Sequence, residues 1–326
     1  MRTVALLLCV AAMVFRPAPC AGAVTYKLVD LGTLAGDSDS AAYAINDNGQ
    51  IVGDSYSSST GFRAFLWHNG AMADLHTSDV GGETHAYSIN ERGQIAGSVG
   101  SSLGIVWYNE ATTVLWGHQG YGARAYSIND SGQVVGWSYS GGGFLPYLWQ
   151  NGSQNGSILY VSNPPDGMAY CINNHAQVVG VSVQGGFLWD GGTGSYLGYS
   201  SQAYSINESG QIVGSVGNGA CRWQNGVVTV LGPGCARAIN DIGQIVGYGG
   251  YGNEHAFLWQ KGAITDLGTL PGAEYSQAYG INSNGWIVGE SGGHAVLWQP
   301  VPEPSSLLAL LCRLGGMAGI IRYRRR

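Results

Sequence analysis

Charge and cysteine are both scarce in this sequence of 326 residues. Asp, Glu, Lys and Arg make up only 10% of it and 45% is hydrophobic, which excludes a chain kept disordered by its charge. Of six cysteines, only Cys171, Cys221 and Cys235 lie away from the two ends. An odd number excludes a complete disulfide framework, although one bridge between Cys221 and Cys235 stays open. Glycine, in contrast, occurs 54 times beside 19 tyrosines, which is typical of short strands joined by tight turns.

Motifs of common enzymes and metal sites are also missing. There is no His-Glu-x-x-His and no glycine-rich phosphate loop with a lysine. Gly-x-Ser triplets such as Gly53-Asp54-Ser55 recur with a repeat, so they indicate strand structure and not a nucleophile. Three short clusters offer too few ligands for a metal: Glu83 with His85, Glu254 with His255, and Asp37 with Asp39. We therefore expect no catalytic residue, no metal and no cofactor.

Both ends of the chain have the patterns of export signals. Arg2, an apolar run over 4–15 and the small residues 21–23 predict a secretory signal peptide over residues 1–23. At the other end, an apolar stretch over 307–321 has a short acidic proline motif before it and arginines behind it, and such arginines stay on the cytoplasmic side of a membrane. The flanking residues are Pro302, Glu303, Pro304, Arg322, Arg324, Arg325 and Arg326.

This tail, residues 301–326, resembles the PEP-CTERM sorting signal, which an exosortase recognises and cleaves in some Gram-negative bacteria. The resemblance implies an apolar sorting helix, an exosortase-type partner and a transient membrane tether before the protein reaches the cell surface or the extracellular space. Arg313 interrupts the apolar stretch, and fifteen residues give about 22 Å of helix against a bilayer core of ~30 Å. Marginal insertion of this kind suits a transient signal.

The body between the two ends is strongly acidic. Residues 24–300 hold 7 basic and 19 acidic residues, a net charge of −12. Such a body repels nucleic acid and anionic membranes. We expect no nucleic-acid partner, and membrane contact only through the C-terminal segment.

A repeat of 33 to 44 residues organises this body. One phrase, first seen at 42–53 as AYAINDNGQIVG, occurs seven times, and a second phrase that ends in Trp follows each copy. The repeated asparagines are Asn46, Asn90, Asn129, Asn173, Asn207, Asn240 and Asn282. The repeated tryptophans are Trp67, Trp107, Trp149, Trp189, Trp223, Trp259 and Trp298.

Each repeat fits four short strands, the size of one propeller blade. The seventh repeat lacks a fourth strand after Trp298, but residues 26–32 before the first repeat end in the same Asp-Leu-Gly as 266–268. If residues 26–32 complete the last blade, the ring closes and leaves no free sheet edge at the seam. We predict an all-β, seven-bladed β-propeller over residues 24–300, with an open solenoid as the alternative.

Repeated side chains have structural explanations in such a ring. Small residues, including Cys171, precede the repeated Ile because inner strands crowd each other, so Cys171 is expected to fill space and not to react. The tryptophans are expected to pack between blades. The asparagines are expected to hold a hairpin whose third position needs Gly, and Ala176 breaks that rule, which predicts strain or another turn.

The repeat resembles the HAF extracellular repeat, named for a His-Ala-Phe phrase seen here at 255–257. The linking phrase Leu-Gly-Thr-Leu at 31–34 and 267–270 also matches, and the resemblance covers nearly all of residues 26–299. Arg63 and Gly104 stand at or near the histidine position in other repeats. The resemblance implies an exported repeat protein and gives no ligand.

Longer, variable loops, those from second to third and from fourth to first strand, fall on one face, where recognition is expected. Tyr56, Tyr139, Tyr248, Tyr251 and Tyr275 lie in or near these loops and could stack on sugars or simply cover the rim. We predict a non-catalytic binding or scaffold protein of the cell surface or exopolysaccharide, with a polysaccharide or surface protein as partner.

Two other functions stay open. The first is a lyase or hydrolase of extracellular glycans, which would require two or more acidic groups facing inward near the channel mouth. The second is a structural surface protein that assembles with copies of itself.

Overall fold

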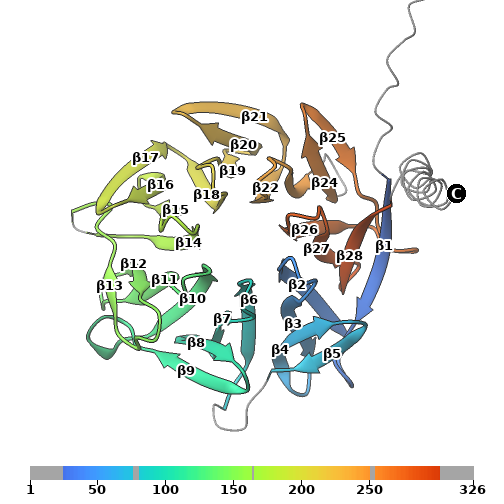
Figure 1. Ribbon diagram of the computed structural model, residues 1–326, viewed down its shortest axis with the longest axis horizontal. Coiled ribbons are helices and arrows are strands. Elements are labelled where there is room, and N and C mark those ends of the chain that lie inside the picture. Colours follow the sequence, from blue (N-terminus) through green and yellow to red (C-terminus); the bar gives the residue numbers. More distant parts are fainter. Residues whose placement is uncertain (1–24, 76–80, 164, 250–253, 302–326) are drawn as a thin grey trace, which may run out of the picture. The chain divides into compact units, whose positions relative to one another are not determined.

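Seven antiparallel four-stranded sheets surround a central axis in the computed structural model, which describes residues 25–75, 81–163, 165–249 and 254–301 (Figure 1). The predicted all-β, seven-bladed propeller is therefore confirmed. The signal peptide and the sorting tail, with its predicted helix, lie outside the described residues. Within those residues the only helix is the 3-10 turn η1 (His118–Gly120), and none is long and apolar enough to span a bilayer.

Each blade runs from an inner strand at the axis to an outer strand at the rim. The inner strands are β2 (Asp39–Ile45), β6 (Thr84–Ile89), β10 (Ala123–Ile128), β14 (Met168–Ile172), β18 (Ser201–Ile206), β22 (Cys235–Ile239) and β26 (Ser276–Ile281). The second strands are β3 (Ile51–Ser57), β7 (Ile95–Val99), β11 (Val134–Tyr139), β15 (Val178–Ser182), β19 (Ile212–Val216), β23 (Ile245–Gly249) and β27 (Ile287–Ser291).

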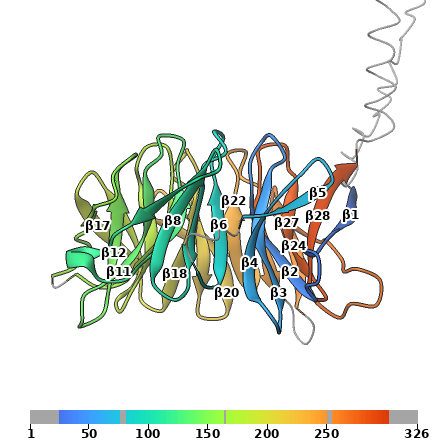
Figure 2. The same cartoon turned by 90° about the horizontal axis from the view of Figure 1, so that it is seen from below.

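The third strands are β4 (Gly61–His68), β8 (Leu103–Tyr108), β12 (Phe144–Trp149), β16 (Gly185–Asp190), β20 (Gly219–Gln224), β24 (His255–Gln260) and β28 (His294–Val301). The outer strands are β5 (Ala71–Asp74), β9 (Ala111–Leu115), β13 (Gly156–Ile158), β17 (Thr193–Gly198), β21 (Val227–Pro233), β25 (Ala263–Asp266) and, in the last blade, β1 (Thr25–Gly32). Figure 2 shows the loops gathered on two opposite faces of this ring.

The ring closes as predicted, because β1 is the outer strand of the sheet β1-β28-β27-β26. A pair of side chains marks the equivalence of this blade with the others. His294 of β28 contacts Asp30 of β1 at 3.0 Å, as His255 contacts Asp266 at 2.9 Å in the preceding blade. The two repeated phrases, His-Ala-Phe and Asp-Leu-Gly, are thus linked by a contact between third and outer strands.

The short hairpin between the first two strands follows the same geometry in all seven blades. In the first, the Gly49 amide donates to the Asn46 carbonyl at 3.1 Å, and Gly49 has φ 75°. This left-handed conformation suits glycine. Ala176 adopts the same turn with φ 60°, so the fourth hairpin keeps its shape at the cost of the predicted strain.

Buried tryptophans join neighbouring blades, as predicted. The Trp298 side chain is fully buried, and its indole Nε1 donates to the Leu267 carbonyl of the preceding blade at 2.9 Å. Trp149 and Trp223 make the equivalent bonds to Trp116 and Leu197. Each such indole buries a large apolar surface and satisfies its own N–H at the blade interface.

The repeated asparagines form a closed ring of hydrogen bonds at the hairpin end of the axis. Each buried Asn side chain accepts a hydrogen bond within its own hairpin, as predicted, and also donates from Nδ2 to the carbonyl of the next asparagine at 2.9–3.1 Å. The last bond runs from Asn282 back to Asn46, across 236 residues of sequence. We call these seven residues the asparagine ring.

Candidate functional site

A bulge in every inner strand creates the candidate site. The pairing of the first two strands skips one residue in each blade, for example between Ala42 and Ala44. The skipped residue is a tyrosine in six blades and an arginine in the sixth along the chain. Bulges re-aim side chains, and here they turn the skipped residues toward the axis. These are Tyr43, Tyr87, Tyr126, Tyr170, Tyr204, Arg237 and Tyr279, which we call the tyrosine belt.

A repeated glycine makes the bulge possible. The first glycine of each Gly-x-Ser-like triplet lies beside the bulge on the second strand, and a Cβ atom added there would meet a backbone oxygen of the inner strand at 1.8–2.0 Å. Any side chain at these positions would push the two strands apart. The glycines are Gly53, Gly97, Gly136, Gly180, Gly214, Gly247 and Gly289.

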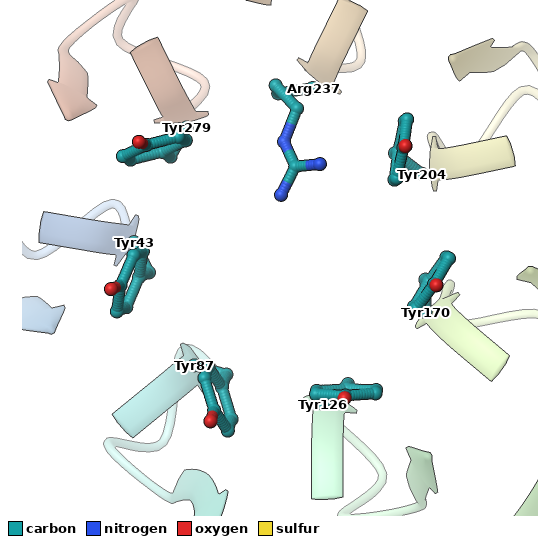
Figure 3. Close-up of a pocket in the computed structure, with 7 residues that line it drawn as sticks. All are labelled: Tyr43, Tyr87, Tyr126, Tyr170, Tyr204, Arg237 and Tyr279. Atoms are coloured by element: carbon teal, nitrogen blue, oxygen red, sulfur yellow. The ribbon is translucent and has the colours of Figure 1, made fainter. Parts of the chain in front are cut away.

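The belt is continuous around a cavity of about 490 Å³. Neighbouring tyrosine rings have centroids 5.3–6.0 Å apart. Arg237 fills the seventh place, with its guanidinium 4.4 Å from the Tyr204 ring and 5.8 Å from the Tyr279 ring. Figure 3 shows the seven side chains around an open centre, with the arginine pointing into it.

The belt's hydroxyl groups contact the residues at the loop-face end of the cavity. The Tyr43 hydroxyl donates to Asp54 at 3.0 Å, and the Tyr279 hydroxyl donates to Gln277 at 2.6 Å. Burial, followed by the charge of Cys235, raises the pKa of Tyr204 to about 12, and burial also raises the pKa of Tyr43 and Tyr279. These phenols are therefore neutral at physiological pH.

Below the belt, small residues line the channel first and acidic residues line it further down. The next layer carries the small residues of the inner strands, among them Cys171, whose thiol pKa is raised by burial. The space-filling role predicted for Cys171 agrees with this position. The lower mouth is lined by five carboxylates, those of Asp47, Glu91, Asp130, Glu208 and Asp241.

Cys221 and Cys235 are both free thiols in the described chain, so the disulfide bridge that the sequence left open is not formed.

Two carboxyl groups flank the belt at its upper side, on neighbouring blades. Asp54 is 3% exposed and accepts hydrogen bonds from Tyr43 and, through its other oxygen, from His85. Burial raises the pKa of Glu290, as do the charges of Asp54 and Asp39, whereas hydrogen bonds from Tyr275 and Tyr279 lower it. Both acids therefore interact with the belt at the end where the long loops lie.

The tyrosines predicted on the loop face surround this upper mouth. Tyr56 and Tyr139 each connect to the belt through aromatic neighbours, Tyr56 through Phe62 and His85, and Tyr139 through Phe144 and Trp137. Tyr248 lies beside Cys235 and Arg237, and Tyr275 hydrogen-bonds Glu290. Tyr251 lies outside the described residues.

The tyrosine belt itself was not predicted. Its signal was a tyrosine at one position in six repeats and an arginine at that position in the sixth repeat along the chain, but strand alternation alone does not reveal a bulge. The Gly-x-Ser serines are structural, since Ser55 and Ser291 are fully buried and bridge backbone groups. Asp37 pairs with Arg63 at 2.7 Å, and the described residues contain no cluster of three or more metal-ligating side chains.

No protein-family model matches the sequence, and no curated protein matches it either. A solved streptogramin B lyase superposes with a TM-score of 0.58 at 12% identity, over 85% of this chain and 98% of its own. The extracellular domain of a putative one-component system from B. thetaiotaomicron superposes with a TM-score of 0.58 at 11% sequence identity. The superposition covers 85% of this chain and 40% of that one. YCF48 bound to a D1 peptide superposes with a TM-score of 0.55 at 12% sequence identity, over 86% of this chain and 96% of its own. At such identities the similarity shows the propeller fold alone.

Proposed function

We propose that this chain is a non-catalytic binding protein of the cell exterior, whose tyrosine belt holds part of a surface or extracellular polysaccharide. The observation that carries the proposal is the belt, where six aromatic rings and one guanidinium surround a cavity of about 490 Å³. Aromatic faces pack against the C–H faces of sugars, while a few polar groups fix orientation. The leader, the tail and the repeat resemblance support export.

The surroundings of the belt agree with a polymer as ligand. Tyr139, Phe144 and Tyr121 are 41–47% exposed and are close enough to make aromatic contacts at the rim. Trp137 connects them to the belt, because its indole Nε1 donates to the Tyr126 hydroxyl at 3.1 Å. A chain bound in the channel would therefore meet further aromatic surface outside it.

A glycan array probed with the purified protein tests this proposal. Tyr87→Ala and Tyr170→Ala should each weaken the best ligand about tenfold, because each removes one stacking face worth roughly 1.4 kcal/mol. Tyr160→Ala and Tyr199→Ala, at positions 63% and 84% exposed, are matched controls and should bind normally. Failure to retain any glycan, or equal binding by belt and control variants, would contradict the proposal.

A second function, cleavage of a glycan, is favoured by one observation. The Tyr43 hydroxyl donates to Asp54 at 3.0 Å, and Tyr275 and Tyr279 hydrogen-bond Glu290, so two carboxyl groups lie at the upper mouth, as an enzyme would require. A carboxyl group with a raised pKa is suited to act as a general acid. Release of new sugar ends from a bound polysaccharide, abolished by Glu290→Gln, would replace binding by catalysis as the main function.

A further inference from the structure

Arg237 is the one belt residue that is not a tyrosine, but it occupies the same position in its blade as the six tyrosines do in theirs. It occupies the bulge between Ala236 and Ala238 in β22, where six other blades place tyrosine. Its guanidinium is held by aromatic faces at 4.4 and 5.8 Å, which orient a cation while leaving its N–H groups available. Figure 3 shows the group reaching into the open centre of the cavity.

No carboxylate of the described chain forms an ion pair with Arg237. Arg63, by comparison, contacts Asp37 and Asp74 at 2.7 and 2.8 Å. Besides the aromatic rings, the Arg237 side chain meets the Cys235 thiol, which is a weak acceptor. A positive charge in a half-buried aromatic cavity, with no carboxylate of the described residues in ion-pair contact with it, is an electrostatic site for an anionic ligand.

The two mouths of the channel are not equivalent for such a ligand. Five carboxylates line the lower mouth and would repel an anion there. At the upper mouth, Asp54 has both oxygens engaged by Tyr43 and His85, and the raised pKa of Glu290 favours its neutral form. An anionic ligand would therefore enter from the loop face.

We infer that Arg237 makes the channel selective for a sugar that carries a carboxylate, that is, a uronic acid residue of a polysaccharide. The planar guanidinium donates two parallel hydrogen bonds to a carboxylate, while the tyrosine rings enclose the sugar ring. This inference rests on the proposed function and adds the class of ligand to it.

Calorimetric titration of the purified protein with matched pairs of oligosaccharides tests the inference. The probes are oligomers of galacturonic, glucuronic and mannuronic acid, each as the free acid and as its methyl ester, which removes only the charge. At least one free acid should bind about tenfold more tightly than its ester, and the difference should shrink as salt is raised. A sulfated oligomer of otherwise neutral sugars shows whether an anion other than a carboxylate is enough for tight binding.

Two variants separate charge from shape. Arg237→Tyr restores the residue found in the other six blades, so the fold should tolerate it, and Arg237→Gln keeps a hydrogen-bond donor without the charge. Both should abolish the preference for the acid, because the affinity for the free acid falls about tenfold toward the affinity for its ester. Thermal unfolding and circular dichroism confirm that each variant is folded.

The outcomes distinguish this inference from the function on which it rests. Equal binding of acid and ester, an unchanged preference in Arg237→Tyr, or binding of the sulfated oligomer alone would overturn selectivity for a carboxylate while glycan binding stands. If no acid or ester binds to folded protein, the inference is wrong, and the glycan array then decides the proposed function separately.

Discussion

The two ends of the central channel are built by the same seven repeats but obey different rules. At the hairpin end, all seven positions are asparagine, and all seven make the same hydrogen bond to the next blade. At the loop end, the tyrosine belt contains an arginine, and the contacts of its hydroxyl groups differ from blade to blade. Symmetry holds where the ring must close and is lost where a ligand could bind.

A physical reason underlies this difference. A closed ring of hydrogen bonds leaves every buried amide satisfied only if each member repeats the same geometry. The belt has no such requirement, because its side chains are half-buried around a cavity and each contacts its own surroundings. The variable end is therefore free to acquire ionisable groups such as Arg237, Asp54 and Glu290.

The glycine beside each bulge lets the inner strand turn its belt residue toward the axis. Among the substitutions considered, replacing this glycine should lower the free energy of unfolding most. Gly214→Ala would place a Cβ atom 1.8 Å from the Gln202 carbonyl oxygen, so the bulge that turns Tyr204 inward must shift. We expect a loss of about 3 kcal/mol in unfolding free energy, measured by urea denaturation. Gly142→Ala, with no atom within 4 Å, is the control. A loss in Gly214→Ala as small as in the control would contradict the proposed origin of the belt.

Within one blade, the residue of the asparagine ring should contribute more to the free energy of unfolding than the hydroxyl group of the belt tyrosine. Asn173→Ala removes the donor to the Asn207 carbonyl and the acceptor for the Gln177 amide, at a site 3% exposed. Buried partners left unpaired should cost at least about 2 kcal/mol. Tyr170→Phe, whose lost hydroxyl contacts only the Met168 sulfur at 3.9 Å among the described residues, should cost under about 0.5 kcal/mol. Equal losses would show that the ring is not the stabilising end.

The fold was predictable because its determinants repeat. The seventh repeat lacks a fourth strand after Trp298, and residues 26–32 end in the same Asp-Leu-Gly as 266–268, so closure by β1 was predictable. The turn rule identifies Ala176 as an exception from the residue type alone. In each case a local rule about turns or sheet edges acts within one or two repeats, and seven copies make it visible.

The candidate site was predicted only in part, for reasons that are also physical. Loop connectivity predicted Tyr56, Tyr139, Tyr248 and Tyr275 on the loop face, where the structure also has them, and their role in binding stays a prediction. The belt depends on a bulge, which shifts one residue out of the strand alternation and does not appear in the residue pattern. The contact between Asp54 and His85 joins two blades, and which partners meet there depends on blade packing.

The one irregular hairpin offers a smaller test of the regular end. Ala176 has φ 60°, which an alanine adopts at a cost and a glycine adopts freely. Ala176→Gly makes the fourth hairpin like the other six and should raise the unfolding free energy by up to about 1 kcal/mol. Chemical denaturation measures the change. A destabilised variant would mean that the Ala176 side chain contributes packing that outweighs the strain of its backbone.

Glu290 provides the subtlest test of the irregular end, through the dependence of stability on pH. Burial, the largest cause, raises its pKa above the ordinary 4.5, so the fold favours the neutral carboxyl group. As the pH rises from 4.5 through the raised pKa, the folded protein must ionise a half-buried group that ionises freely when unfolded, and the free energy of unfolding falls. Glu290→Gln lacks this loss, so its melting temperature relative to the natural protein should rise from pH 4 to pH 8.

Glu290→Asp, which retains an ionisable group, should keep a fall in stability over this range. If the melting temperatures of the natural protein and the Gln variant changed in parallel with pH, the upper mouth would impose no cost on the ionisation of Glu290, and this part of the contrast between the two ends would be wrong.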